Sequence, residues 1–224
     1  VCPGETLCIL GESGSGKSVS TSAIMGLIDT PPGDIVAGRM VFDGRDLSAM
    51  TGEERRDLNG RRIAMIFQDP LSALTPVYTI GDQIVEALQV HSNMSDKDAW
   101  ARALELLDMV GIPNPEVRAK AFPHEFSGGM RQRALIAMGL AAHPKLLIAD
   151  EPTSALDVTV AKKILDHLDK LTSELGTSVV LITHDLGLAA ERADRLVVMQ
   201  AGRVVETGTH AELIAHGGLY ARLW

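Results

Sequence analysis

The sequence predicts an α/β fold built on a parallel β-sheet, with a helical segment inserted into the sheet and a small antiparallel hairpin beside it. Short apolar runs alternate with helical patterns toward both ends of the chain, which is typical of β-α-β units. Between about residues 79 and 143 the pattern is helical alone. An Asp43-Gly44 dipeptide that follows an apolar run indicates a tight hairpin turn.

The first third of the chain contains three predicted strands and two predicted helices. The spacing of apolar residues and turn residues predicts, in order, a strand over 7–10, a helix over about 18–28, a strand over 38–42, a helix that begins at a Thr51/Glu54 capping box, and a strand over 63–67. The strand over 63–67 is expected to be buried.

The rest of the chain is predicted to contain the helical segment and the remaining strands. Ser95 with Asp98 caps a helix whose apolar residues share one face, and Gly111 ends it. After the helical segment we expect a strand over 146–149, an amphipathic helix over 158–175, a strand over 179–183, and two strands, 196–199 and 204–205, on either side of a turn at 201–202.

Composition narrows the class of protein. The chain has 224 residues, a 46% hydrophobic and 22% charged composition and a net charge of -8, which suits one folded domain and disfavours nucleic acid as a partner. The longest apolar run, 134–142, is too short to span a bilayer, so we expect any membrane role to come from partner subunits. Because the first strand follows Val1 almost at once, we expect an N-terminal piece to be missing.

A glycine-rich loop between the first strand and the first helix matches G-x-x-x-x-G-K-[ST] at residues 11–18. Gly14 and Gly16 would let backbone N–H groups turn toward a β-phosphate, Lys17 would reach the β and γ oxygens, and Ser18 would place its hydroxyl on Mg²⁺. The predicted nucleotide-binding residues are Gly11, Glu12, Ser13, Gly14, Ser15, Gly16, Lys17, Ser18 and Val19.

Polar residues follow three of the predicted strands and would meet at one sheet edge. Asp150 suits a ligand of Mg²⁺, directly or through water, and Glu151 suits a general base for an attacking water. An Asp-Glu pair at a strand end is usually part of a solvated turn with no function. Because this pair occurs together with a phosphate loop, a functional role is the favoured interpretation. His184 would reach a γ-phosphate, and the Gln68 amide would bind Mg²⁺ or hold the water. Pro152 predicts an extended conformation for Glu151.

The ordered motifs GESGSGKS, IFQDP, FSGGM, LLIADE, SALD and ITHD resemble those of the ATP-binding subunits of ABC transporters. The stretches IFQDPLSALTPVYTIGDQI and AFPHEFSGGMRQR are most similar to the oligopeptide, dipeptide and nickel import group. The resemblance implies a P-loop NTPase fold over 1–224, with a RecA-like parallel core and a small antiparallel part in 1–78 and 144–224. It implies an inserted helical subdomain over 79–143.

The same resemblance implies roles and partners. The signature residues Ser127, Gly128 and Gly129 would complete an ATP site on a second ATPase domain, in a homo- or heterodimer, and Asp157 would lie at that interface. ATP and Mg²⁺ are the implied cofactors, and Glu151, His184 and Gln68 the implied catalytic residues. The implied partners are transmembrane permease subunits, which the segment 69–84 would face, and indirectly a solute-binding protein. The resemblance also implies that the subunit lies at the cytoplasmic face of the membrane, as a peripheral protein.

Some alternatives stay open at this point. The signature has Phe126 and Met130 where the superfamily pattern is LSGGQ, and the tail GTHAELIAHGGLYARLW resembles that of other ABC ATPases, exporters included. An ATPase of another ABC transporter, or a soluble ABC-type ATPase without a membrane partner, is therefore an alternative. A GTPase is disfavoured because the chain has no N-K-x-D stretch.

Overall fold

The structure is a computed structural model that describes residues 1–29, 31–154, 156 and 158–224. Its strands are β1 (Thr6–Gly11), β2 (Val41–Phe42), β3 (Arg45–Asp46), β4 (Ile63–Ile66), β5 (Leu146–Asp150), β6 (Ser178–Thr183), β7 (Arg195–Gln200) and β8 (Arg203–Gly208). Its helices are α1 (Lys17–Met25), α2 (Gly52–Leu58), α3 (Pro70–Ala73), α4 (Ile80–Gln89), α5 (Asp96–Met109), α6 (Pro115–Arg118), α7 (Gly128–Leu140), α8 (Val158–Leu175), α9 (Leu186–Arg192), α10 (His210–His216) and α11 (Leu219–Leu223), with 3₁₀ turns η1 (Leu47–Ala49) and η2 (Pro123–Glu125).

A six-stranded sheet forms the centre of the molecule, in the order β4-β5-β6-β1-β7-β8. The pairs are parallel up to β7, and β8 closes the edge as an antiparallel strand. Strands β2 and β3 form a separate antiparallel pair. The predicted fold class, a parallel core with a small antiparallel part and inserted helices, is confirmed.

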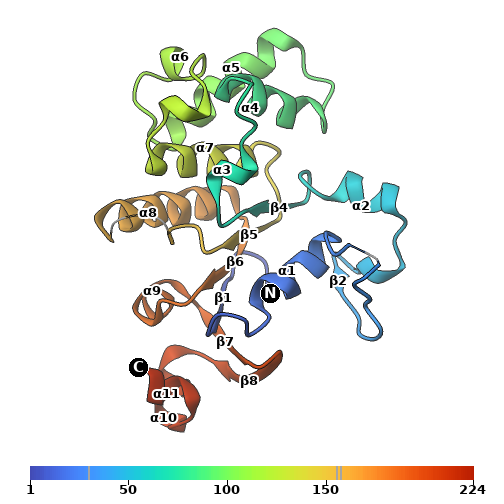
Figure 1. Ribbon diagram of the computed structural model, residues 1–224, viewed down its shortest axis with the longest axis vertical. Helices are drawn as coiled ribbons and strands as arrows, with labels where there is room; N and C mark the ends of the chain where they lie inside the picture. Colours follow the sequence, from blue (N-terminus) through green and yellow to red (C-terminus); the bar gives the residue numbers. More distant parts are fainter. Residues whose placement is uncertain (30, 155, 157) are drawn as a thin grey trace.

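Apolar side chains are buried on both faces of the sheet. Along β6, Val179 and Leu181 belong to the larger core, which includes residues of α4, α5, α7 and α8. Val180 and Ile182 point to the other face, where they join Met25 of α1 in a smaller core. This alternation follows the two-residue period of a strand. In Figure 1 helices α4–α7 gather at one end of the molecule and α10–α11 at the other, with the sheet between them.

The strand register aligns the carboxyl ends of four neighbouring strands. Ile66 pairs with Ala149, Asp150 with Ile182, and Thr183 with Leu10. Residues that directly follow β4, β5, β6 and β1 therefore emerge at the same edge, which is where ligands bind in open α/β sheets.

The helical stretch between β4 and β5 follows the predicted caps. Ser95 accepts a hydrogen bond from Asp98 N–H at the start of α5, whose buried face contains the predicted residues Ala99, Ala103, Leu106 and Leu107. The helix ends before Gly111, which has a φ of 72°. No helix within the described residues has the length and hydropathy needed to cross a bilayer.

Two element boundaries differ from the predicted ones. The helix expected to continue to residue 28 ends at Met25, because Gly26 takes a left-handed φ of 69° and its N–H returns to carbonyls of the last turn. The strand expected over 38–42 is shorter in the structure, where β2 comprises only Val41–Phe42. Gly38 has a φ of 119°, which lies outside the strand region.

Candidate active site

The glycine loop between β1 and α1 requires glycine at three positions. Gly14 and Gly16 have φ angles of 78° and 98°, in a region that side chains disfavour. At Gly11 a Cβ atom would lie 2.4 Å from the Met199 carbonyl oxygen and 2.5 Å from Ser15 Oγ. The loop therefore turns tightly against the neighbouring strand β7, and residues 11–19 form one continuous path from β1 into α1.

Lys17 and the start of α1 provide the positive charge of this loop. Lys17 is 6% exposed, and its Nζ donates hydrogen bonds to the carbonyl oxygens of Gly11 at 2.7 Å and Glu12 at 3.0 Å. No side chain caps the N-terminus of α1, whose first N–H groups have no partners within the helix. An ammonium group beside these N–H groups suits a bound phosphate.

Asp150 lies buried at the end of β5, beside the loop. It is 5% exposed, and its Oδ1 has no hydrogen-bond partner. Burial raises the pKa of its carboxyl, and a hydrogen bond with Ser18 opposes that shift. Within the described residues no group of three His, Cys, Asp or Glu side chains is placed to hold a metal. The unpartnered oxygen beside a hydroxyl is a hard donor set that fits Mg²⁺, which takes few protein ligands and fills its coordination with water and phosphate.

Three side chains from three strand ends meet beside Asp150. Gln68, after β4, donates from Nε2 to Glu151 Oε2 at 3.0 Å. His184, after β6, has its Nδ1 3.3 Å from Glu151 Oε1. The Glu151 side chain is 17% exposed and that of His184 is 64% exposed, so the carboxylate is held while the imidazole is open to solvent. The sequence-based expectation that parallel strands bring Glu151 and His184 to one edge agrees with this geometry.

The predicted extended conformation of Glu151 is wrong. Its φ is 44°, in the left-handed region. Its N–H donates to the Ile182 carbonyl on β6 and its carbonyl accepts from Ser154 N–H. These two hydrogen bonds hold the residue in a turn, and they outweigh the preference that Pro152 imposes.

The signature segment forms the first turn of α7. Ser127 caps the helix, with its Oγ accepting from Met130 N–H at 3.4 Å. A Cβ on Gly129 would lie 2.9 Å from Val160 Cγ1 of α8, so glycine allows close contact there. Met130 is partly buried against the larger core, an environment in which a flexible thioether side chain packs well.

The signature and the glycine loop do not form one site within this chain. No hydrogen bond among the described residues joins 127–129 to 11–18. Figure 1 places α7 in the helical part beside α8, apart from α1. Asp157, predicted at a dimer interface, lies outside the described residues.

A family model described as ABC transporter matches residues 1–154. The chain belongs to the ABC transporter family. It is 55% identical over 210 residues to the oligopeptide transport ATP-binding protein OppD of Bacillus subtilis (strain 168), covering 94% of this chain and 59% of that protein. It is 54% identical over 205 residues to the dipeptide transport ATP-binding protein DppD of Escherichia coli (strain K12), covering 92% of this chain and 62% of that one.

Solved structures of the same family agree with the fold. The chain superposes with a TM-score of 0.82 on a post-hydrolysis dimer of the ATP-binding cassette MJ0796 bound to ADP and phosphate. That cassette is 31% identical, and the match covers 93% of this chain and 87% of the cassette. This ABC family chain thus spans most of a cassette, but only about three fifths of the curated relatives it matches.

The sequence of this ABC family chain did not predict one contact that supports the glycine loop. The Ala201-Gly202 turn between β7 and β8 lies against the loop, where Gly202 N–H donates to the Ser15 carbonyl at 3.0 Å. A Cβ on Gly16 would lie 3.6 Å from both Gly202 Cα and Met199 Cε. The sequence identified this turn but carries no local signal for its contact with a loop near the other end of the chain.

Proposed function

We propose that this chain binds ATP with Mg²⁺ and hydrolyses it as a subunit that energises an ABC importer of di- or oligopeptides. The observation that carries the proposal is the Gln68–Glu151–His184 cluster at the sheet edge that also bears the phosphate loop. The relatives named as oligopeptide and dipeptide transport proteins support the substrate class.

Residues 11–19 would hold the nucleotide phosphates. The N–H groups of the glycine loop and of the first turn of α1 would donate to phosphate oxygens. Lys17 Nζ donates to the Gly11 and Glu12 carbonyl oxygens in this structure. With nucleotide bound, it would donate to the β- and γ-phosphate oxygens instead. Val19 is 63% exposed at this end of α1, so its side chain is open to solvent beside the loop.

Ser18, Asp150 and Gln68 would hold Mg²⁺, Asp150 directly or through a water. When bound, the ion neutralises charge that develops on the phosphate oxygens. The buried, unpartnered Oδ1 of Asp150 supports this assignment, because a buried carboxylate oxygen without a partner is costly unless a cation or water meets it.

Glu151 would act as the general base. Its carboxylate would accept a hydrogen bond from the attacking water and take its proton as the water oxygen bonds to the γ-phosphorus and the bond from that phosphorus to the bridging oxygen of the leaving ADP breaks. Gln68 would orient that water or bind the ion, and His184 would donate to the γ-phosphate. The open imidazole of His184, 64% exposed, supports its availability to a ligand.

Ser127, Gly128, Gly129 and Asp157 would serve a second ATPase domain. The capped N-terminus of α7 suits the γ-phosphate of a nucleotide on the partner, and this chain's own loop does not reach it. The dimeric MJ0796 cassette supports such an assembly. We infer that 79–143 is the helical subdomain that carries this signature, and that 1–78 with 144–224 is the nucleotide-binding core.

The proposed partners are transmembrane permease subunits and, through them, a solute-binding protein, with the chain at the cytoplasmic face of the membrane. Exposed apolar side chains in the segment that follows β4, Leu71, Val77 and Tyr78, support a permease contact there.

The test has two arms. Purified protein should release phosphate from ATP in the presence of Mg²⁺ and not when the metal is chelated; no release with its membrane subunits present would reject the ATPase role. Deleting the gene should abolish uptake of labelled di- or oligopeptides and spare uptake of a free amino acid. Unchanged peptide uptake would reject the substrate class alone.

A further inference from the structure

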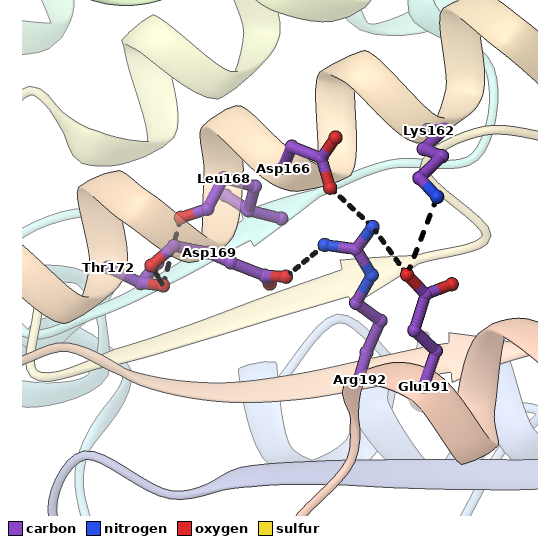
Figure 2. A network of polar contacts seen from close by, with 7 residues as sticks. All are labelled: Lys162, Asp166, Leu168, Asp169, Thr172, Glu191 and Arg192. Carbon is purple, nitrogen blue, oxygen red and sulfur yellow. Dashed lines mark hydrogen bonds and ion pairs between the residues drawn. The ribbon is translucent and has the colours of Figure 1, made fainter.

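An ion cluster joins the far end of α9 to the middle of α8. Arg192, the last residue of α9, donates from Nη1 to Asp169 Oδ2 at 2.5 Å and from Nη2 to Asp166 Oδ1 at 2.5 Å. Glu191 Oε1 lies 3.5 Å from Arg192 Nη2 and 3.7 Å from Lys162 Nζ. Figure 2 shows the guanidinium of Arg192 lying between the two α8 aspartates.

Arg192 differs from an ordinary surface arginine in its burial. Its side chain is 9% exposed, whereas those of Asp166 and Asp169 are 52% and 40% exposed. The planar guanidinium meets a separate carboxylate with each terminal nitrogen, which fixes orientation as well as distance. Within α9, Ala189 is buried and Leu186 and Leu188 pack partly buried against the larger core; the ion cluster adds the charged contacts of this helix with α8.

Helix α9 links Arg192, at its C-terminal end, to His184, which precedes its N-cap. The helix has seven residues, a length of about 10 Å. Its N-cap is Asp185, which accepts from Leu188 N–H at 3.0 Å, and His184 is the preceding residue. If α9 tilted as one body about its C-terminal end, the tilt would displace His184 and lengthen its 3.3 Å contact with Glu151.

A cavity of about 370 Å³ separates α8 from α9 next to the proposed catalytic residues. Its lining includes Glu151, His184, Lys162, Glu191 and Arg192. Because this space is not filled by side chains, apolar packing between the two helices is incomplete there. Loss of the ion cluster would therefore remove the charged link between the two helices at the place where apolar packing between them is incomplete.

We propose that Arg192 is a positioning residue. Its ion pairs with α8 hold helix α9 in place and so keep His184 within contact distance of Glu151. The inference deepens the proposed ATPase function and rests on it. Arg192 does not touch the reacting atoms; it acts through the helix that carries His184.

The test replaces Arg192 with Gln and compares turnover, nucleotide affinity and backbone dynamics. We expect kcat for ATP hydrolysis to fall roughly tenfold to a hundredfold, as for other misplaced catalytic groups, while KM and the Kd for ATP change by less than about twofold. Without nucleotide, amide hydrogen exchange across 186–193 should become faster. Arg192→Lys should have a kcat between those of Arg192→Gln and the wild type. An ammonium group can pair with one of the two aspartates but cannot meet both as the planar guanidinium does.

A double-mutant cycle separates positioning from a general loss of structure. In a His184→Ala background, which lacks the group to be positioned, adding Arg192→Gln should change kcat by less than about twofold. Lys162→Gln is the matched control in the same cluster, since its Nζ contact is 3.7 Å long and its side chain is 63% exposed; it should leave kcat unchanged.

A second variant covers the case in which Arg192→Gln fails to fold. Asp166→Asn/Asp169→Asn removes the charges of the two α8 partners of Arg192, whose side chains are 52% and 40% exposed, and should lower kcat in the same way. An active wild type with unchanged kcat in the variants, or with additive losses in the cycle, would overturn the positioning role alone. A wild type without ATPase activity would overturn the proposed function and the positioning role together.

Discussion

Replacing Glu151 with glutamine tests the proposed general base with the least change in shape. The amide has the size of the carboxylate and keeps one oxygen acceptor for Gln68 or His184, at positions now 3.0 Å and 3.3 Å away. What it loses is the ability to take a proton. The loss of one side-chain hydrogen bond of this kind costs about 1 kcal/mol of folding free energy, which lowers the melting temperature of a chain this long by a few degrees.

The effect on catalysis should be far larger. A positioned general base contributes a factor of about 100 to 10,000 in rate, or roughly 3 to 5 kcal/mol of activation free energy. We expect phosphate release by Glu151→Gln to fall by that factor, while the Kd for ATP, measured by fluorescence of a nucleotide analogue, stays within about twofold. Turnover within about threefold of wild type would remove Glu151 from the base role, since no ordinary base contribution is that small.

Three further changes test other parts of the molecule. Ser127→Arg should block hydrolysis and spare ATP binding, because it alters the half of the site offered to a second domain; loss of ATP binding by the monomer would contradict this. Leu107→Ala, at a fully buried position of α5, should lower the unfolding free energy by about 2–5 kcal/mol in urea, and a loss under about 1 kcal/mol would contradict the packing. Burial raises the pKa of Asp150 in the folded state, so its stabilising contribution is present below the unfolded-state pKa and is lost as pH rises through the folded one. Asp150→Asn should therefore be more stable than wild type at neutral pH, with the difference shrinking toward pH 3, while Mg²⁺-dependent turnover is lost; equal stability at both pH values would refute the sign.

The sequence predicted the meeting of the site residues because parallel pairing is a strong constraint. Gln68, Glu151 and His184 each follow a short apolar strand, and parallel strands end at one edge. The order of β4, β5 and β6 in the sheet then makes them neighbours. A local motif, the position of a strand end and one rule of sheet topology were sufficient for this part of the site.

Contacts between distant segments could not be predicted in the same way. Gly202 supports the glycine loop through a backbone N–H, and a backbone contact leaves no preference for a residue type beyond the turn itself. Arg192 looks like any charged residue at a helix end, and its partners lie on α8. Charge pairs across helices depend on tertiary packing, which neither periodicity nor capping rules describe.

Glu151 shows a conflict between local preference and the proposed chemistry. A left-handed conformation at a residue other than glycine costs about 1–3 kcal/mol, and glycine would avoid that cost but has no carboxylate. In this turn the side chain meets partners that follow the strands on both sides of β5, Gln68 from β4 and His184 from β6. Its N–H is bonded to the Ile182 carbonyl of the neighbouring strand, so the strained conformation is held by the sheet itself. The extended conformation expected before Pro152 is therefore not found at Glu151, a residue that the sheet holds rigidly and that is the proposed base. Local sequence rules are expected to fail at functional sites of this kind.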